Sequence, residues 1–423
     1  MSAIKIILRI VVLGSVLFAL IATSPFISRT AARERKGKTK ARAHQARESR
    51  SGDTLRNRVQ SMIAIDETAG EDMEVRRVAL SALGNHAGTV VVMDPNTGRI
   101  YSIVNQHWAL REGFKPCSTI KLVTGLAGLN EKLIDTSEPT NLSNNYRMDL
   151  TKALAHSNNA YFQKVGGRVG FEKLLFYARQ LGLGEKTGIN ASNESAGRVP
   201  LNKSGFALNH MSSHGDDFQV TAVQLATLVS AMTNGGKLLT PYIPNAPHIP
   251  QEELQPRVRR QIKMDTEVWS HMVPGMIGAV NYGSGRRAFN PLETIAGKTG
   301  TCIQEGTWVG LFASYAPLAN PRLTVVVIGL GPDARGHFPA AVAGEIYRNL
   351  NHRFGMLDSP QLANSKAPIV RQGLWINNAA KGNTVKSVLM SVPKRTEGNV
   401  NSSTNSKIEA QTPTPPRVSS IRL

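Results

Sequence analysis

The sequence is short of acidic residues, which gives the chain a large positive charge. It has 30 Asp and Glu against 50 Lys and Arg, a formal charge of +20 at pH 7. Residues 29–50 and 360–423 each carry nine Lys or Arg against two Glu, so residues 51–359 are nearly neutral. No nucleic-acid-binding motif accompanies the basic flanks, so we expect no nucleic-acid partner. Such flanks bind anionic polymers or lipid headgroups, or remain solvated tails.

The chain also has few cysteines and no visible internal repeat. Cys117 and Cys302 are the only cysteines, so the chain can form at most one intrachain disulfide. The 423 residues with 41% hydrophobic content are enough for one large domain or two ordinary ones.

An apolar run near the N-terminus indicates a membrane segment. Residues 10–22 are uninterrupted apolar, and residues 4–26 reach spanning length if Lys5 and Arg9 extend to the interface. A cleaved signal peptide is the alternative, but Leu20 is bulky where a cleavage site needs a small residue. We expect residues 1–28 to be an uncleaved anchor, residues 29–84 a basic then acidic linker with one helix near residues 72–83, and residues 358–423 a disordered, polar, basic tail.

The pattern of the central part predicts a mixed α/β (α+β) fold, and we expect the ordered domain to begin at His86. Two strand-like runs come first, over residues 89–104, and three come last, over residues 293–302, 307–315 and 323–330, followed by a helix over 339–351. Between them lie periodic helical segments at 116–130, 148–169 with a break at 156–159, 171–181, 216–232 and 265–280, and a proline-rich loop at 241–256. We expect one antiparallel sheet of about five strands, built from both ends of the domain, with a helical subdomain inserted.

The first chemical motif is a serine and a lysine three residues apart. Ser118 and Lys121 open an apolar helical run, where this spacing places two side chains on one face. An amine that has lost its proton can activate a neighbouring serine as a nucleophile. The alternative is an ordinary polar pair on the first turn of a helix.

The second motif is Lys298, Thr299, Gly300 and Thr301 in a predicted strand. A phosphate-binding loop would need a glycine five residues before the Gly-Lys pair, and position 292 is leucine, which excludes that reading. The run instead suits a strand that lines a cleft. The lysine and the hydroxyls would bind a carboxylate, and the glycine would allow close approach of another backbone. A strand with a chance lysine is the alternative.

The third motif is Ser157 and Asn159, in a break between helical segments. A helix cap would explain these residues equally well. The three motifs together resemble the active-site signature of the penicillin-binding proteins and serine β-lactamases. Residues 92–98, 182–197, 222–236 and 308–310 are similar to the transpeptidase domain of the high-molecular-weight members, so the resemblance covers residues 86–352 and we expect this domain at residues 85–357.

The resemblance implies acyl transfer without a cofactor or a metal ion. Ser118 would attack a D-Ala-D-Ala stem of peptidoglycan, with Lys121 as base, disfavoured as ammonium by burial and by Lys298. Ser157 would relay the proton to the leaving amine and Asn159 would hold the substrate amide. The backbone amides of Ser118 and Thr301 would form the oxyanion hole. The side chains that would hold the terminal carboxylate are Lys298, Thr299 and Thr301.

The resemblance also implies the partners and the compartment. Stem peptides would be substrates, β-lactams inhibitors, and cell-wall synthesis proteins possible partners, with the domain on the outer, periplasmic face of a bacterial inner membrane. The positive-inside rule would instead place residues 29–50 in the cytoplasm. We nevertheless expect the domain outside the membrane, because the implied function acts on the cell wall. A class D-like β-lactamase, a D,D-carboxypeptidase and a non-catalytic β-lactam receptor or scaffold remain alternatives.

Two departures from the family pattern stand out. Cys117 occupies a position at which the family usually has a small residue, and Cys302 directly follows Thr301. A shared oxyanion hole would bring these backbones together, so we hypothesise a disulfide between the two cysteines, with two buried thiols as the alternative. The span between anchor and domain is too short for a glycosyltransferase or a large pedestal domain. In this respect the chain resembles a pared-down, monofunctional member of the family.

Overall fold

The computed structural model describes residues 52–244 and 256–355. The expected anchor at 1–28 and the expected tail at 358–423 lie outside these ranges. Within them, no helix is both long enough and apolar enough to cross a bilayer.

The centre of the fold is one five-stranded antiparallel sheet, as predicted. Its order is β2 (Ile100–Val104), β1 (Gly88–Met93), β9 (Leu323–Leu330), β8 (Thr307–Ala316) and β7 (Ala296–Gln304). Strand β1 pairs with β9, so the two ends of the domain meet in the middle of the sheet. Within residues 52–244 and 256–355, strand β7 pairs only with β8, in a register that sets Lys298 opposite Ala313. This edge strand therefore has one side available to the helical part.

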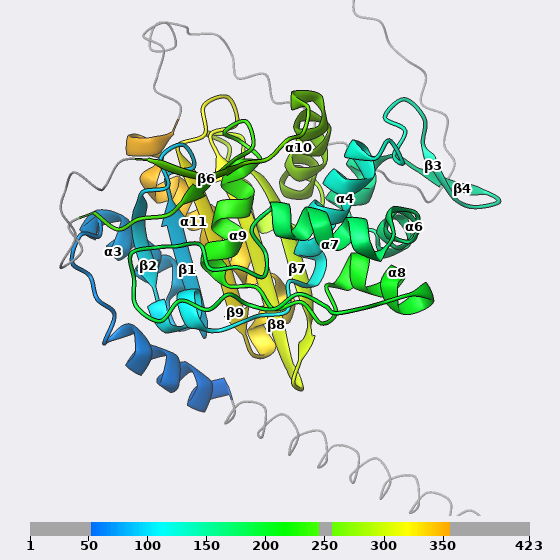
Figure 1. The fold of residues 1–423 in the computed structure, drawn as a ribbon. Coiled ribbons are helices and arrows are strands. Elements are labelled where there is room, and N and C mark those ends of the chain that lie inside the picture. The colour runs from blue at the N-terminus through cyan, green and yellow to red at the C-terminus, as the bar shows by residue number, and fades with distance from the viewer. Residues whose placement is uncertain (1–51, 245–255, 356–423) are drawn as a thin grey trace, which may run out of the picture. The chain divides into compact units, whose positions relative to one another are not determined.

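Helices cover both faces of the sheet, which is why the inner strands β1 and β9 are almost entirely apolar, whereas the edge strand β7 carries Lys298, Thr299 and Thr301. Alternate residues belong to two separate cores: Val91 and Val326 face one side, and Val92 and Val325 face the other. Helix α9 (Ala222–Ala231) packs on the first side, and α3 (Met73–Leu83) and α11 (Phe338–Phe354) pack on the second (Figure 1). Thr221 caps α9 in a full capping box with Gln224.

A group of helices lies beside β7 and forms the helical part of the domain (Figure 1). It contains α4 (Lys121–Asn130), α5 (Leu150–Ala155), α6 (Asn159–Val169), α7 (Phe171–Gln180), α8 (Gly205–His214) and α10 (Thr266–Asn281). Pro274 lies inside α10. The sequence did not predict α8, nor the small sheets β3 (Thr140–Ser143) with β4 (Tyr146–Met148) and β5 (Lys237–Thr240) with β6 (Arg257–Gln261). The predicted helix at 216–232 begins later, because residues up to Val220 form bridges rather than helix.

The second half of the expected linker is folded, which corrects the expectation that order begins at His86. Residues 52–63 form a helix, and Val59 in it is fully buried in the core. Further along, Arg76 of α3 donates to the carboxylates of Asp66 and Glu71, each at 3.0 Å, and all three side chains are at most 6% exposed. Composition suggested a linker because the residues are polar, but here their charges are paired inside the protein.

Candidate active site

The candidate nucleophile lies on a short 3-10 turn at the base of α4. The turn spans Cys117–Ile120, and Lys121 is the first residue of the α-helix that continues it. Because three residues make one turn of a 3-10 helix, Ser118 and Lys121 lie on the same side. Their Oγ and Nζ atoms are 2.6 Å apart, and Lys121 is fully buried. The pair is therefore in contact, as the spacing predicted.

The second motif reaches the same lysine from the junction of α5 and α6. Asn158 is the helix cap, since its side chain accepts from the backbone N–H of Tyr161. The capping role belongs to Asn158 and leaves its neighbours free to face the cleft. Lys121 Nζ lies 2.6 Å from Asn159 Oδ1 and 3.3 Å from Ser157 Oγ.

The third motif supplies a second buried lysine on the opposite wall. Lys298 on β7 is fully buried, and its Nζ donates to Ser157 Oγ at 2.9 Å and to the carbonyl of Thr299 at 2.8 Å. Ser157 therefore stands between the two lysines. All three predicted motifs meet at one place.

Burial controls the charge of both lysines. It lowers the pKa of Lys121 from 10.5 to about 7, because water no longer solvates the ammonium form. Burial also holds the pKa of Lys298 well below its usual value, and the nearby charge of Lys121 lowers it further. Repulsion between the two ammonium groups is mutual, so it disfavours a state in which both lysines are charged. At neutral pH, Lys121 can therefore be without its proton and serve as a base.

The remaining residues of the β7 motif line the wall next to Lys298. Thr299 is buried and its hydroxyl lies 2.6 Å from Ser284 Oγ, while Thr301 Oγ1 lies 3.5 Å from His337 Nδ1. The sequence did not identify Ser284 or His337. Ser284 lies in a Gly-Ser-Gly loop after α10, a weak signal, and nothing near His337 marked it as part of the site.

The close approach expected at Gly300 is present. A Cβ atom there would lie 2.9 Å from the carbonyl oxygen of Pro116 and 3.3 Å from Cys117 Cβ. Any side chain at Gly300 would push β7 away from the segment that holds Ser118.

The hypothesised disulfide is present and joins the segment that holds Ser118 to strand β7. Cys117 and Cys302 are bonded, with Cα atoms 5.6 Å apart, and the two residues are 185 positions apart in the sequence. The bond joins the residue before Ser118 to the residue after Thr301.

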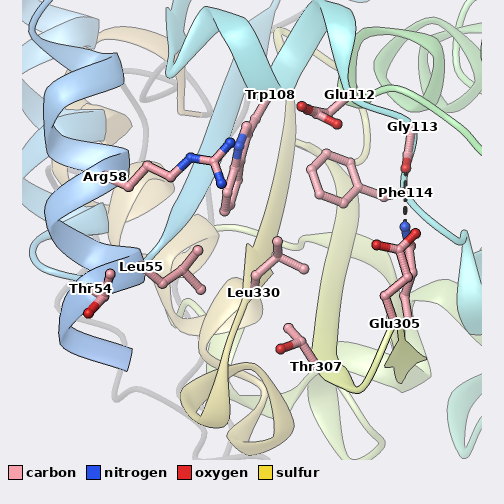
Figure 2. Close-up of a pocket in the computed structure, with 11 residues that line it drawn as sticks. Thr54, Leu55, Arg58, Trp108, Glu112, Gly113, Phe114, Glu305, Thr307 and Leu330 are labelled. Atoms are coloured by element: carbon pink, nitrogen blue, oxygen red, sulfur yellow. Dashed lines mark hydrogen bonds between the residues drawn. The ribbon is translucent and has the colours of Figure 1, made fainter. Parts of the chain in front are cut away.

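A cavity of about 650 Å³ lies apart from these residues, next to the helix at 52–63. Figure 2 shows Arg58 reaching from that helix toward Trp108, with Phe114 and Glu305 on the other side. Ser118, Lys121 and Lys298 do not line it. Gln304, in its lining, accepts a hydrogen bond from the backbone N–H of Lys115, three residues before the serine. Among the residues that the structure describes, no cluster of His, Cys, Asp and Glu suits a metal ion.

Comparisons with known proteins agree with this arrangement. The sequence model of the penicillin binding protein transpeptidase domain matches residues 88–352. Stage V sporulation protein D of Bacillus subtilis is 28% identical over 284 residues, which cover 59% of this chain and 43% of that protein. The peptidoglycan D,D-transpeptidase MrdA of Acinetobacter baumannii is 25% identical over 363 residues, covering 66% of this chain and 54% of that protein. This chain thus spans about half the length of these relatives.

The solved structures show the same fold. The apo transpeptidase domain of Burkholderia pseudomallei penicillin-binding protein 3 superposes with a TM-score of 0.61 at 18% identity, over 69% of this chain and 98% of that one. At this identity the likeness concerns the fold alone. The match of the family model covers more than half of the chain, and with the fold it leads to one conclusion: this chain belongs to the penicillin-binding protein transpeptidase family.

Proposed function

We propose that the protein is a serine D,D-transpeptidase that cross-links peptidoglycan through an acyl-enzyme. The observation that carries the proposal is the contact of Ser118 Oγ with a buried lysine amine whose pKa is about 7. A serine hydroxyl is a poor nucleophile unless a base removes its proton, and a neutral amine at 2.6 Å is such a base. Relatives named peptidoglycan D,D-transpeptidases support the same reading.

The first step breaks the bond between the last two D-alanines of a stem. Ser118 Oγ attacks the carbonyl of the penultimate residue while Lys121 takes the hydroxyl proton. The proton passes through Ser157, which contacts both lysines, to the departing amine. The backbone amides of Ser118 and Thr301 stabilise the oxyanion. D-Alanine leaves and a serine ester remains.

The second step passes the acyl group to an amine of a neighbouring stem. The amine attacks the ester, a new amide bond forms, and Ser118 regains its proton. Before D-alanine leaves in the first step, Lys298, Thr299 and Thr301 bind the terminal carboxylate of the donor, and Asn159 holds its amide. A carboxypeptidase or a class D-like β-lactamase would use water instead of the amine, and a scaffold would bind β-lactams without turnover.

Labelling with a fluorescent penicillin tests the proposal. The β-lactam carbonyl would be trapped as an ester of Ser118, so the wild-type protein should carry a covalent label and Ser118→Ala should carry none. A label that persists for hours supports a transpeptidase over a β-lactamase. An unlabelled, folded wild-type protein would exclude the enzymatic reading.

We propose further that the domain lies outside the cytoplasmic membrane, anchored by residues 1–28. The apolar run at residues 10–22 and the Cys117–Cys302 disulfide support this location, because disulfides persist in oxidising compartments. Interaction with other cell-wall synthesis proteins would follow from the same location. Alkaline carbonate extraction should leave the full-length protein in the membrane pellet, and external protease should reach it in spheroplasts. Release by carbonate would contradict the anchor.

A further inference from the structure

The side-chain amide of Asn159 contacts a different group with each of its ends. Its Oδ1 lies 2.6 Å from Lys121 Nζ, and its Nδ2 lies 3.2 Å from Nε2 of His214, the last residue of α8. An amide nitrogen has two hydrogens to donate and no lone pair to offer. His214 Nε2 must therefore accept this hydrogen bond.

The contacts of the other ring nitrogen fit that requirement. If Nε2 accepts, the ring proton of neutral His214 is on Nδ1. Nδ1 lies 2.7 Å from Ser213 Oγ and 3.3 Å from the carbonyl oxygen of His210, and both oxygens can accept it. One neutral tautomer thus satisfies every polar contact of the ring.

The groups around His214 also favour the neutral ring. His210 stacks on it with ring centroids 3.8 Å apart, and Lys121 faces it from α4. Asp216 binds Nδ1 of His210 and forms an ion pair with Lys115, so its charge is already shared by two partners. Burial, His210 and Lys121 lower the pKa of His214, and the carbonyl of His210 and the charge of Asp216 offset this only in part.

The position of His214 is tied to that of the nucleophile. Gly215 follows it in a left-handed conformation, with φ of +70°, and a Cβ there would lie 2.5 Å from Pro116 Cγ and 3.2 Å from the backbone nitrogen of Cys117. The end of α8 therefore packs directly against the segment that carries Ser118.

The orientation of the Asn159 amide decides where the lone pair of Lys121 points. A neutral amine has two N–H groups and one lone pair. When the N–H groups go to Asn159 Oδ1 and Ser157 Oγ, the lone pair is left for the Ser118 hydroxyl. If the amide turned over, its NH₂ group would face Lys121 and compete for that lone pair.

We propose that His214 is a positioning residue: its Nε2 fixes the Asn159 amide so that the lone pair of Lys121 faces Ser118. The inference rests on the proposed acyl transfer. A proton on Nε2 would turn this nitrogen into a donor that faces another donor. The amide would then turn over, and Ser118 would lose its base. Acylation therefore requires two groups, Lys121 and His214, to be without their extra protons.

The rate of acylation by a fluorescent penicillin, measured between about pH 5 and 9, tests this inference. With two protonations that stop the reaction, the logarithm of the wild-type rate constant should fall with a slope that steepens from one toward two as the pH decreases. His214→Gln keeps an acceptor near the Nε2 position and cannot titrate. It should stay within about threefold of wild type at pH 8 and show a slope of one throughout.

A donor-only variant completes the test. His214→Arg presents only N–H groups to Asn159, so acylation should be at least tenfold slower than wild type at pH 8. Its charge alone would predict the opposite, because a nearby cation favours the neutral form of Lys121. His271→Gln on the exposed side of α10 is the matched control and should leave the profile unchanged.

Four outcomes separate the possibilities, with melting temperatures to verify folding. A wild-type slope of one throughout, or a His214→Gln variant that keeps the steep slope, would overturn the positioning role. So would a folded His214→Arg variant that acylates as fast as wild type. A wild-type protein that takes up no label would instead refute the proposed function.

Discussion

The burial that makes Lys121 a base also removes its ammonium form from water, and this lowers the stability of the folded protein. Its pKa is about 7 in the folded chain and 10.5 when solvated. Between these values the unfolded chain binds more protons than the folded one, so stability rises with pH across this window. Below pH 7 the full cost is present, at most about 5 kcal/mol at 1.36 kcal/mol per unit.

Replacing Lys121 with methionine should therefore raise stability while abolishing penicillin labelling. Methionine keeps the apolar stem and removes the amine, and the lost hydrogen bonds, about 1 kcal/mol each, offset only part of the gain. The gain in melting temperature should be larger at pH 6 than at pH 9. Thermal unfolding at both pH values measures it, with the exposed Lys186→Met as control. A variant that is less stable than wild type at both pH values would contradict the argument.

At the residue scale, local spacing predicted the contacts that one turn of helix creates. Ser118 and Lys121 are such a pair, and the resemblance to a known family then supplied Ser157 and Lys298. His214, Ser284 and His337 escaped prediction because their neighbours are 15 or more residues away in sequence. Only the packing of α8, of the loop after α10 and of the start of α11 brings them to the site.

At the scale of elements, the contact between β7 and the Ser118 turn sets the distance between the two segments that carry Ser118 and Lys298. Gly300→Ala would place a methyl group 2.9 Å from the Pro116 carbonyl oxygen. That oxygen cannot move freely, because it accepts hydrogen bonds from the backbone N–H and the hydroxyl of Thr119. We expect penicillin acylation to slow at least tenfold, with a stability loss of about 1–3 kcal/mol from overpacking.

Stopped-flow acylation and urea unfolding of this variant would check the expectation. Ile303→Ala is the matched control, because Ile303 lies on the same strand with 53% of its surface exposed. If Gly300→Ala acylates at the wild-type rate, the close approach of the two walls is not needed for the reaction.

The elements that were missed lack a hydrophobic pattern. Strand β6 has the sequence Arg-Val-Arg-Arg-Gln, and its partner β5 is only four residues long. Helix α8 carries two serines and three histidine or asparagine side chains among its ten residues. Strands β1 and β9 of the main sheet were predictable because burial on both faces favours continuous apolar runs, such as the three consecutive valines in each strand.

At the scale of the whole molecule, residues 52–84 belong to the folded body. Arg76 holds the buried carboxylates of Asp66 and Glu71, and Glu71 also accepts from the backbone N–H of Ile103 on β2. Composition could not reveal this, because a polar segment that pairs its charges inside the protein has the same residues as a solvated linker.

Arg76→Met should reduce the free energy of unfolding by roughly 3–5 kcal/mol, because it leaves two carboxylates buried without a cation. Arg56→Met removes a comparable set of ion pairs, to Asp53 and Asp333, at a side chain that is 35% exposed. It should cost less than about 1 kcal/mol. Equal losses for the two variants in urea unfolding would show that burial of the Arg76 group contributes little.

The Cys117–Cys302 bond has a topological consequence. The 185-residue separation makes this part of the chain a covalent ring that contains every helix from α4 to α10, while β1, β2, β8 and β9 lie outside it. A protease that cuts once within the ring leaves a single covalent molecule, with the two walls of the cleft still joined. The segments that carry Ser118 and Thr301 are thus held together by a bond that does not depend on the continuity of the helical part.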